Sequence, residues 1–235
     1  MPELNKYDLH WCVRRLPRTL RDVLKREAIV VAGGYIRACI LNEQINDVDL
    51  FVDSKQYAKD LALDMAGGDE KRLVETVNAI TIKGMKYPVQ FITRWTYGSP
   101  HDVLQSFDYT ICQSAFWWDH YCQKWCSSIS ESFYSDLAAK RLVYTEPIRE
   151  EEPGGSILRV LKYYQRGYRI TIDSFSRVIT RLAHGVDLNR INTDANGHVD
   201  TFEFQKVVRG LLHEVDPNID PDHIIEDVRF GGDDD

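Results

Sequence analysis

Two aspartates two positions apart, Asp47 and Asp49, are the side chains of this sequence best suited to carry out chemistry. They belong to the segment DVDLFV, whose apolar residues are typical of a strand, so both carboxylates would project from the same face. Paired carboxylates bind Mg²⁺ or Mn²⁺ together with the phosphates of a substrate. Because two such ions can bridge an attacking hydroxyl and a leaving pyrophosphate, the pair predicts a site for phosphoryl transfer.

A glycine pair, Gly33 and Gly34, stands upstream of the aspartates, between an apolar run and a helical pattern in AIVVAGGYIRACIL. Glycine lets the backbone approach a phosphate closely, and the N-terminus of a helix favours an anion. Arg37 follows within the same helical pattern. The ordered set of strand, glycine pair, helix with an arginine, and strand with two aspartates is far more specific than the two aspartates alone.

The hydrophobic pattern indicates the elements that must position these residues. It predicts a short strand at 29–32, a helix at 55–65 and a hairpin formed by 78–83 and 87–95. The pattern is helical from residue 131 onward. We therefore predict an α+β fold, in which a mixed sheet with flanking helices is followed by a small helical region.

The best internal boundary is the segment PIREEEPGGS, which combines proline, a run of charges and two glycines. We expect a head domain at 1–146, a helical neck and C-terminal segment at 147–212, and a flexible acidic tail at 213–235. The net charge of the chain is −7, but residues 211–235 alone carry −8. The preceding 210 residues therefore sum to +1, and the net charge does not exclude a nucleic-acid substrate.

Four stretches of the sequence resemble, in order, the head domain of the DNA polymerase β-like nucleotidyltransferase superfamily. The resemblance is closest to the branch of bacterial poly(A) polymerases and class II CCA-adding enzymes. The first stretch, GGYIRACILNEQINDVDLFV, carries the glycine pair and the two aspartates. The others are 107–111, 133–141 and the basic segment 159–168. The resemblance covers roughly residues 28–170 and implies a nucleotidyltransferase head followed by a neck helix.

The resemblance also implies roles for individual residues in binding Mg²⁺ and an NTP, expected to be ATP or CTP. It places Gly33 and Gly34 around the triphosphate with Arg37 in contact with it, Asp47 and Asp49 at Mg²⁺, and Asp108 either at the ribose or as a further member of the carboxylate set. On the neck helix, Arg159, Lys162 and Arg166 would face the triphosphate or an RNA backbone, and Tyr163 and Tyr168 would stack on a base. The alternative is a neck helix whose aromatic residues pack on the head and whose cations are solvated.

Several positions depart from the family pattern. Ser106 and Phe107 stand where the family has two arginines, and Ser156 replaces an aspartate that helps to select the incoming base. Gln90 lies on the strand where many superfamily members place a third carboxylate. These departures leave the NTP preference open.

A second pattern, near the C-terminus, resembles a single EF-hand. With Gly197 at loop position 6, residues 192–203 place oxygen ligands at positions 1, 3, 5, 7, 9 and 12, between helical patterns at 174–184 and 202–212. The candidate Ca²⁺ ligands are Asn192, Asp194, Asn196, His198 through its carbonyl, Asp200 and Glu203. Asn192 departs from the aspartate usual at position 1. The alternative is a helix-turn-helix whose polar residues only cap the helices.

The expected function is transfer of a nucleoside monophosphate from an NTP to a hydroxyl acceptor with release of pyrophosphate. By resemblance the acceptor is an RNA or tRNA 3′ end; a protein or small-molecule acceptor is one alternative. A non-catalytic, calcium-responsive, nucleotide-binding module that engages a protein partner is another. Five scattered cysteines, without a secretory signal or an apolar span, predict a cytoplasmic protein with reduced thiols and no membrane segment. The candidate partners also include a second copy of this chain.

Overall fold

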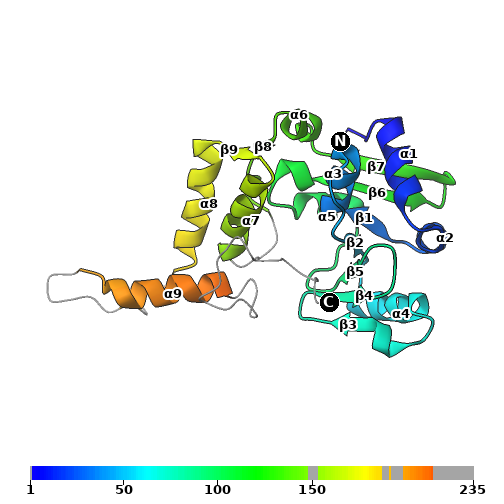
Figure 1. The fold of residues 1–235 in the computed structure, drawn as a ribbon, viewed down its shortest axis with the longest axis horizontal. Coiled ribbons are helices and arrows are strands. Elements are labelled where there is room, and N and C mark those ends of the chain that lie inside the picture. The colour runs from blue at the N-terminus through cyan, green and yellow to red at the C-terminus, as the bar shows by residue number, and fades with distance from the viewer. Residues whose placement is uncertain (1, 148–152, 187–190, 192–197, 214–235) are drawn as a thin grey trace. The chain divides into compact units, whose positions relative to one another are not determined.

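The computed structural model describes residues 2–147, 153–186, 191 and 198–213 (Figure 1). The chain divides into two compact units. The first unit comprises Met1–Ala139 and Thr145–Arg149, and the second comprises Lys140–Tyr144 and Glu150–Asp235. The predicted acidic tail, 213–235, lies outside the described residues except for residue 213.

A seven-stranded mixed sheet forms the centre of the first unit, in the order β3-β4-β5-β2-β1-β6-β7. Strands β2 and β5 pair in parallel, and the other neighbours pair antiparallel. The α+β head with a mixed sheet is therefore confirmed, and the predicted hairpin at 78–83 and 87–95 forms as β4 and β5. The strands are β1 Val30–Ala32, β2 Val48–Phe51, β3 Leu73–Glu75, β4 Ala79–Ile82, β5 Val89–Ile92, β6 Ser114–Asp119 and β7 Lys124–Ile129.

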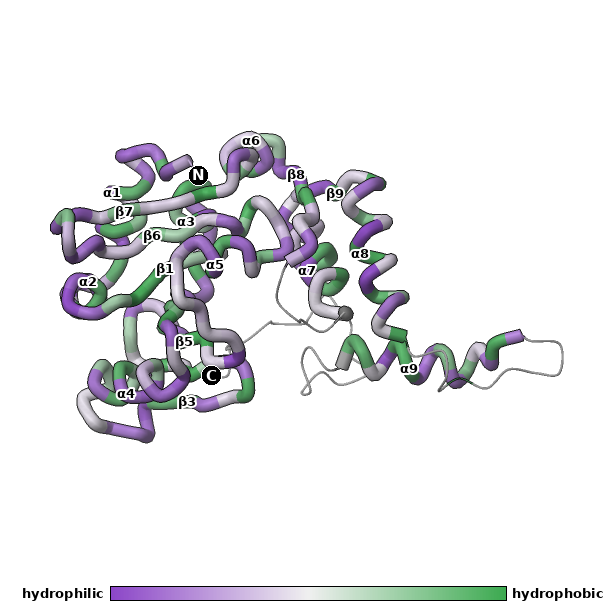
Figure 2. Tube along the Cα trace, turned by 180° about the vertical axis from the view of Figure 1, so that it is seen from behind, coloured by the Kyte–Doolittle hydropathy of each residue, from purple (hydrophilic) through white to green (hydrophobic). Residues whose placement is uncertain are grey.

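Helices pack on this sheet from both sides. Helix α1 packs on α3, α2 on β6, α4 on β4 and β5, and α5 on β1, β6 and β7. Figure 2 shows the apolar strand β1 in green and helix α2 changing between purple and green along its length. The helices are α1 Lys6–Arg15, α2 Arg18–Arg26, α3 Gly34–Leu41, α4 Lys55–Met65, α5 Pro100–Gln105 and α6 Phe133–Ala138, with 3₁₀ turns η1 at Glu70–Arg72 and η2 at Thr110–Cys112.

The alternation of side chains along the strands separates two core layers. On one face, Phe116 of β6 packs against Tyr35 of α3 with the ring centroids 6.5 Å apart. On the other face, Ala32 of β1 and Ala115 of β6 are paired in register and lie in a buried cluster with Val103 of α5. The site described below lies on this second face, because Asp49 is the register partner of Ala32.

The second unit is mainly helical. Helix α7 packs against α8 and α9, and the short strands β8 and β9 pair in parallel. A Cβ on Gly154 would lie 2.6 Å from the carbonyl oxygen of Leu211, so this glycine permits the close approach of α7 and α9. The elements are β8 Arg141–Leu142, α7 Pro153–Gln165, β9 Arg169–Ile170, α8 Ile172–His184 and α9 Thr201–His213.

Two further expectations concern cysteines and membranes. All five cysteines are free, as predicted. Among the described residues, none of the helices combines the length and apolar character needed to cross a membrane.

Candidate functional site

The glycine turn between β1 and α3 begins at Gly33, whose φ of 81° lies in the left-handed region that favours glycine. A Cβ at this position would come within 3.0 Å of two ring carbons of Phe107. The Gly33 N–H donates to the carbonyl of Ser114 at 3.0 Å, which joins the turn to β6. Backbone conformation and close approach therefore both require glycine here.

Asp49 lies beside this turn. Its Oδ2 atom is 3.8 Å from the position that a Cβ on Gly33 would occupy. The residue is half-buried, whereas Val48 and Leu50 on either side of it are fully buried on the opposite face of β2. The structure thus brings together the carboxylate and the glycine turn that the sequence predicted as parts of one site.

Asp47 stands immediately before β2, which begins at Val48, so the prediction that both aspartates lie within the strand is one residue too long. The residue is half-buried, like Asp49. Gln90 of β5 is the direct register partner of Asp49. The departure noted in the sequence therefore lies next to the site: a neutral amide neighbours Asp49 where a third carboxylate would add charge.

Arg37 lies beneath the start of α3. Its Nη2 atom is 3.8 Å from the position of a Cβ on Gly34, its Nε pairs with Glu43 Oε2 at 3.3 Å, and Nη1 approaches Cys112 Sγ at 3.9 Å. The side chain is only 3% exposed. A buried guanidinium at the N-terminus of a helix adds positive charge behind the glycine turn, where the helix dipole already favours an anion.

Asp108 is 1% exposed, and its backbone carbonyl accepts a hydrogen bond from the Thr145 N–H at 3.0 Å. Two residues further on, the Thr110 hydroxyl donates to the buried carboxylate of Asp136 at 2.7 Å. This bond joins 107–111 to 133–141, two of the stretches that carry the family resemblance.

A divalent metal ion at this site would have two carboxylates, those of Asp47 and Asp49, as its protein ligands. The described residues contain no group of three or more His, Cys, Asp or Glu side chains arranged to hold a metal ion. Mg²⁺ is commonly held by one or two carboxylates together with substrate phosphates and water. The donors present, Asp47 directly before β2 and Asp49 beside the glycine turn, therefore fit a metal that binds with its nucleotide.

Phe107, which departs from the family pattern, also borders the site. Its half-buried ring lies against Gly33 and makes an edge-to-face contact with Phe51, with the ring centroids 5.9 Å apart. The Phe107 carbonyl accepts from the Thr145 hydroxyl at 2.7 Å, which fixes the backbone that carries the ring. The signal in the sequence is its position directly before Asp108, where the resembled family has an arginine.

The cations predicted for the neck lie in the second unit. Arg159 and Lys162 are on α7, and Arg166 follows one residue after its end. Of the two interpretations of Tyr163 and Tyr168, the one in which the rings pack within the protein fits: they are 6% and 0% exposed and pack on each other with ring centroids 5.7 Å apart.

The exposed aromatic residue of this segment is Tyr164, which is 58% exposed and carries the Arg169 guanidinium 4.6 Å from its ring centroid. The aromatic positions of the neck therefore divide between the buried Tyr163 and Tyr168 and the exposed Tyr164.

Half of the predicted calcium ligands, Asn192, Asp194 and Asn196, lie outside the described residues, whereas His198, Asp200 and Glu203 lie within them. The flanking helices predicted at 174–184 and 202–212 form as α8 and α9. Asp200 Oδ1 accepts from the N–H groups of Phe202 at 2.8 Å and Glu203 at 3.2 Å, which caps the start of α9.

Residues 3–140 match the family described as Gabija anti-defense 2 family protein. A curated relative, "Gabija anti-defense 2" of Bacillus phage SPbetaL7, is 26% identical over 164 residues, which cover 70% of this chain and 40% of the relative. The chain thus spans less than half the length of that protein.

Solved structures share the fold. A Thermotoga maritima CCA-adding enzyme complexed with tRNA is similar with a TM-score of 0.53 and 15% identity, over 93% of this chain and 57% of that one. A CCA-adding enzyme in complex with CTP gives 0.54 and 16%, over 91% and 51%. Another, with ATP, gives 0.54 and 17% over the same shares. At these identities the likeness establishes only a fold shared with these CCA-adding enzymes.

Proposed function

This chain belongs to the Gabija anti-defense 2 family, and we propose that its first unit is a metal-dependent nucleotidyltransferase. It transfers a nucleoside monophosphate from an NTP to a hydroxyl acceptor and releases pyrophosphate. One observation carries the proposal. The Asp49 carboxylate lies 3.8 Å from the position that a Cβ on Gly33 would occupy, and Gly33 directly precedes helix α3. The shared fold with CCA-adding enzymes, some of them solved with CTP or ATP, supports the same reading.

Each part of the site has a distinct task in this proposal. Gly33 and Gly34 let the triphosphate approach the backbone N–H groups of α3, and the buried guanidinium of Arg37 adds charge behind them. Asp47 and Asp49 hold Mg²⁺, which neutralises charge on the phosphates when it is bound. The acceptor oxygen forms a bond to the α-phosphorus while the bond from that phosphorus to pyrophosphate breaks. Positioning and charge neutralisation supply most of the rate enhancement in such a transfer.

The acceptor in this proposal is the 3′ hydroxyl of an RNA. The relative's name indicates that the phage protein counters a defence called Gabija. We infer that this chain also acts against such a defence and that the labelled acceptor belongs to the infected cell. Protein and small-molecule hydroxyls are the other outcomes of the test.

The test uses the full chain with each of the four α-³²P-labelled NTPs, Mg²⁺, and separate RNA and protein fractions from a bacterial host. The proposal expects label in one fraction with one or two of the NTPs, in a form that ribonuclease removes if RNA is the acceptor. Label in the protein fraction alone would support nucleotidyltransferase activity but would show that the acceptor is a protein and not RNA. Absence of label from every fraction, including small molecules, would contradict the proposal that the first unit is an enzyme.

A second candidate, a nucleotide-binding module without turnover that engages a protein partner, is favoured by Phe107 and Gln90. Both lie at the site and replace charged residues of the family pattern with uncharged ones. NTP binding with Mg²⁺, measured by calorimetry, separates this candidate from the first, because it predicts binding without pyrophosphate release. Calcium binding by residues 192–203 is a separate proposal that requires neither activity.

A further inference from the structure

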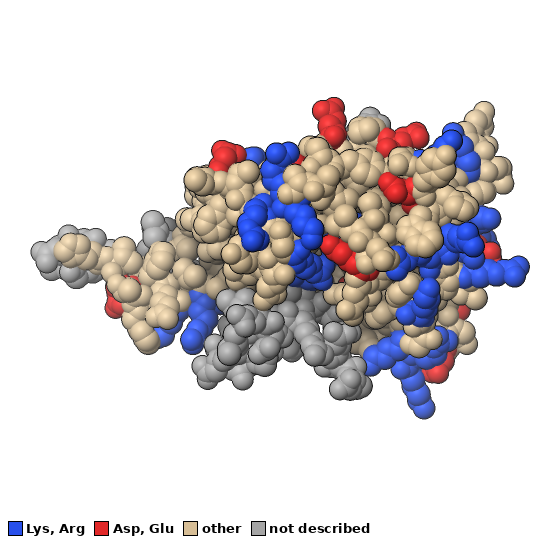
Figure 3. Space-filling model, turned by 45° about the horizontal axis from the view of Figure 1, so that its top comes forward, with Lys and Arg blue, Asp and Glu red and all other residues tan. Residues whose placement is uncertain are grey.

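Helices α1 and α2 of the first unit carry a strong excess of positive charge. The segment Lys6–Arg26 contains seven basic residues and two acidic ones. Both acids are engaged within the protein, because the Tyr134 hydroxyl donates to Asp8 at 2.7 Å and Arg18 pairs with Asp22 at 3.9 Å. Figure 3 shows Lys and Arg side chains gathered on the side of the molecule where Figure 1 draws these two helices.

An open hollow of about 320 Å³ lies on this surface, lined by His10, Val13 and Arg14 of α1 and Arg21 of α2. The hollow is larger than a single water molecule needs, so it can admit a phosphate group. Three of its four lining side chains can donate hydrogen bonds to an anion, and two carry a permanent positive charge. The hollow is therefore suited to a phosphate or another oxyanion.

Arg21 is half-buried where it lines the hollow. Its Nε atom is buried and makes no hydrogen bond to any of the described residues. Because that atom has almost no accessible surface, it is not itself a contact for a group in the open hollow.

Two exposed aromatic rings lie along helix α1. Tyr7 is 73% exposed and Trp11 is 45% exposed, and their four-residue spacing places them on one face of α1. Lys6 lies 5.1 Å from the Tyr7 ring centroid and Arg15 lies 5.6 Å from that of Trp11. Trp11 also donates from Nε1 to the Cys39 carbonyl at 3.1 Å, which fixes the orientation of its ring.

We propose that this surface, which we call the α1–α2 patch (Tyr7, His10, Trp11, Arg14 and Arg21), binds single-stranded nucleic acid. A backbone phosphate occupies the hollow, and bases stack on Tyr7 and Trp11. Cations beside exposed aromatic rings are the usual means of holding single strands without sequence preference. The binding uses neither Asp47 nor Asp49, so it stands or fails independently of nucleotide transfer.

The test measures binding of the full chain to a fluorescent 15-nucleotide oligouridylate between 50 and 200 mM salt. Arg14→Gln/Arg21→Gln should weaken binding at least tenfold at the lowest salt. It should also reduce the slope of log K against log salt by about 1.4, because a single strand contributes roughly 0.7 per phosphate contact. Tyr7→Ala should weaken binding several-fold and leave that slope unchanged. The exposed Lys55→Gln/Lys71→Gln pair, which removes the same charge elsewhere, should change affinity less than twofold.

Three outcomes would overturn the proposal. Equal weakening by the Lys55/Lys71 control would show only the effect of net charge. Tighter binding to a 15-base-pair duplex than to the single strand would exclude stacking on the aromatic rings. A polyglutamate peptide that binds the patch more tightly than the oligonucleotide would identify an acidic protein as its partner. Because Arg21 is partly buried, exposed Arg14→Gln alone serves as the second variant, and it should weaken binding without lowering the melting temperature.

Discussion

Gly33 and Phe107 meet directly across the glycine turn: a Cβ on Gly33 would come within 3.0 Å of two carbons of the Phe107 ring. Phe107 occupies a position at which the nucleotidyltransferases that the sequence resembles have an arginine. Its ring packs edge-to-face against Phe51. One wall of the proposed nucleotide site is therefore apolar, and the positive charge near the turn comes instead from Arg37.

The two glycines of the turn should respond differently to substitution. Gly33→Ala places a side chain at φ 81° and against Phe107, so it should lower the free energy of unfolding by about 1–3 kcal/mol. Gly34→Ala meets no atom closer than Arg37 Nη2 at 3.8 Å, so stability should be unchanged or slightly higher. If the turn cradles a triphosphate, Gly34→Ala should still weaken NTP binding several-fold, because the methyl group occupies the cradle. Denaturant unfolding and calorimetry measure the two effects, and equal destabilisation by both variants would contradict this account.

A third carboxylate beside Asp49 should strengthen the metal site. Gln90→Asp adds a negative charge at the register partner of Asp49, so the Mn²⁺ dissociation constant in the presence of nucleotide should fall at least threefold. Thr81→Asp is the matched control, because Thr81 pairs with Gln90 one strand further from Asp49. Electron paramagnetic resonance of free Mn²⁺ gives both constants. An equal gain from the control would show that Gln90 does not neighbour the metal.

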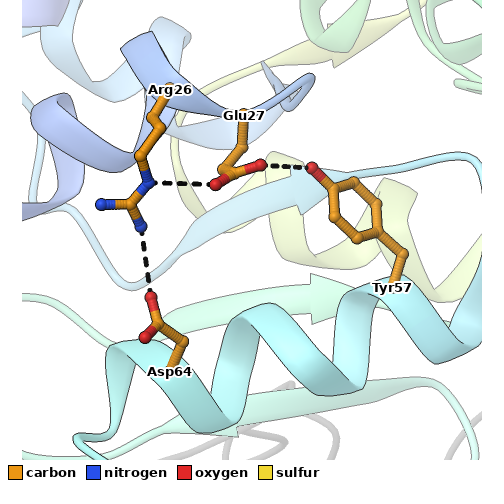
Figure 4. A network of polar contacts seen from close by, with 4 residues as sticks. All are labelled: Arg26, Glu27, Tyr57 and Asp64. Carbon is orange, nitrogen blue, oxygen red and sulfur yellow. Dashed lines mark hydrogen bonds and ion pairs between the residues drawn. The ribbon is translucent and has the colours of Figure 1, made fainter.

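A polar network joins α2 to α4 and makes stability depend on pH (Figure 4). The Tyr57 hydroxyl donates to Glu27 at 2.8 Å, and Arg26 pairs with both Glu27 and Asp64. The hydrogen bond from Tyr57, followed by that from Arg26, lowers the pKa of Glu27 below its ordinary 4.5. Burial, followed by the bond to Glu27, raises the pKa of Tyr57 above 10.0.

Tyr57→Phe should therefore cost about 0.5–1 kcal/mol of unfolding free energy at pH 7. A carboxylate with a lowered pKa stabilises the fold above pH 4.5 and loses that contribution as the pH falls through its folded pKa. The difference between wild type and variant should thus be full at pH 6–8 and shrink below pH 4.5. Asp64→Asn is the control: it breaks only the exposed pair with Arg26 and should have little effect. A difference that persists unchanged at pH 3 would be inconsistent with this network.

The EF-hand resemblance makes a separate prediction for the second unit. Ca²⁺ at millimolar concentration should raise the melting temperature, because a ligand that binds only the folded state stabilises it. Glu203→Gln should remove most of that increase, and Mg²⁺ should not replace Ca²⁺. A melting temperature that does not respond to Ca²⁺ would leave Asp200 with only its capping role at α9.

The elements around the candidate site can be predicted from the sequence because the signals there are local. Gly33 and Gly34 interrupt an apolar run, and Asp47 and Asp49 adjoin a strand whose neighbours are fully buried. The proximity of Asp49 to Gly33 depends on the antiparallel pairing of β1 and β2. A mixed α/β pattern in the sequence does not determine which strands pair or in which direction.

The β6–β7 hairpin was not predicted, because its turn carries no glycine. Gln123 adopts the left-handed conformation with φ 51°, and Asp119 Oδ1 accepts from the N–H groups of Tyr121 and Cys122 at 2.8 Å each. The Asp119 side chain therefore stabilises a turn of the kind that a glycine usually marks in a sequence. In the same way, helical spacing alone could not decide which neck tyrosine is exposed, because Tyr163, Tyr164 and Tyr168 all stand near cations.

The central claim is that Asp49 holds the metal for nucleotide transfer. Its most direct test is the rate of pyrophosphate release from the accepted NTP in the presence of Mg²⁺ and RNA, compared among wild type, Asp49→Asn and Asp53→Asn. Asp53 is exposed just beyond the end of β2 and serves as the matched control. We predict one pyrophosphate for each nucleotide incorporated, a loss of at least 100-fold in Asp49→Asn at an unchanged melting temperature, and near wild-type rates in Asp53→Asn. Pyrophosphate release by Asp49→Asn at the wild-type rate, or none by the wild type with any NTP, would contradict the claim.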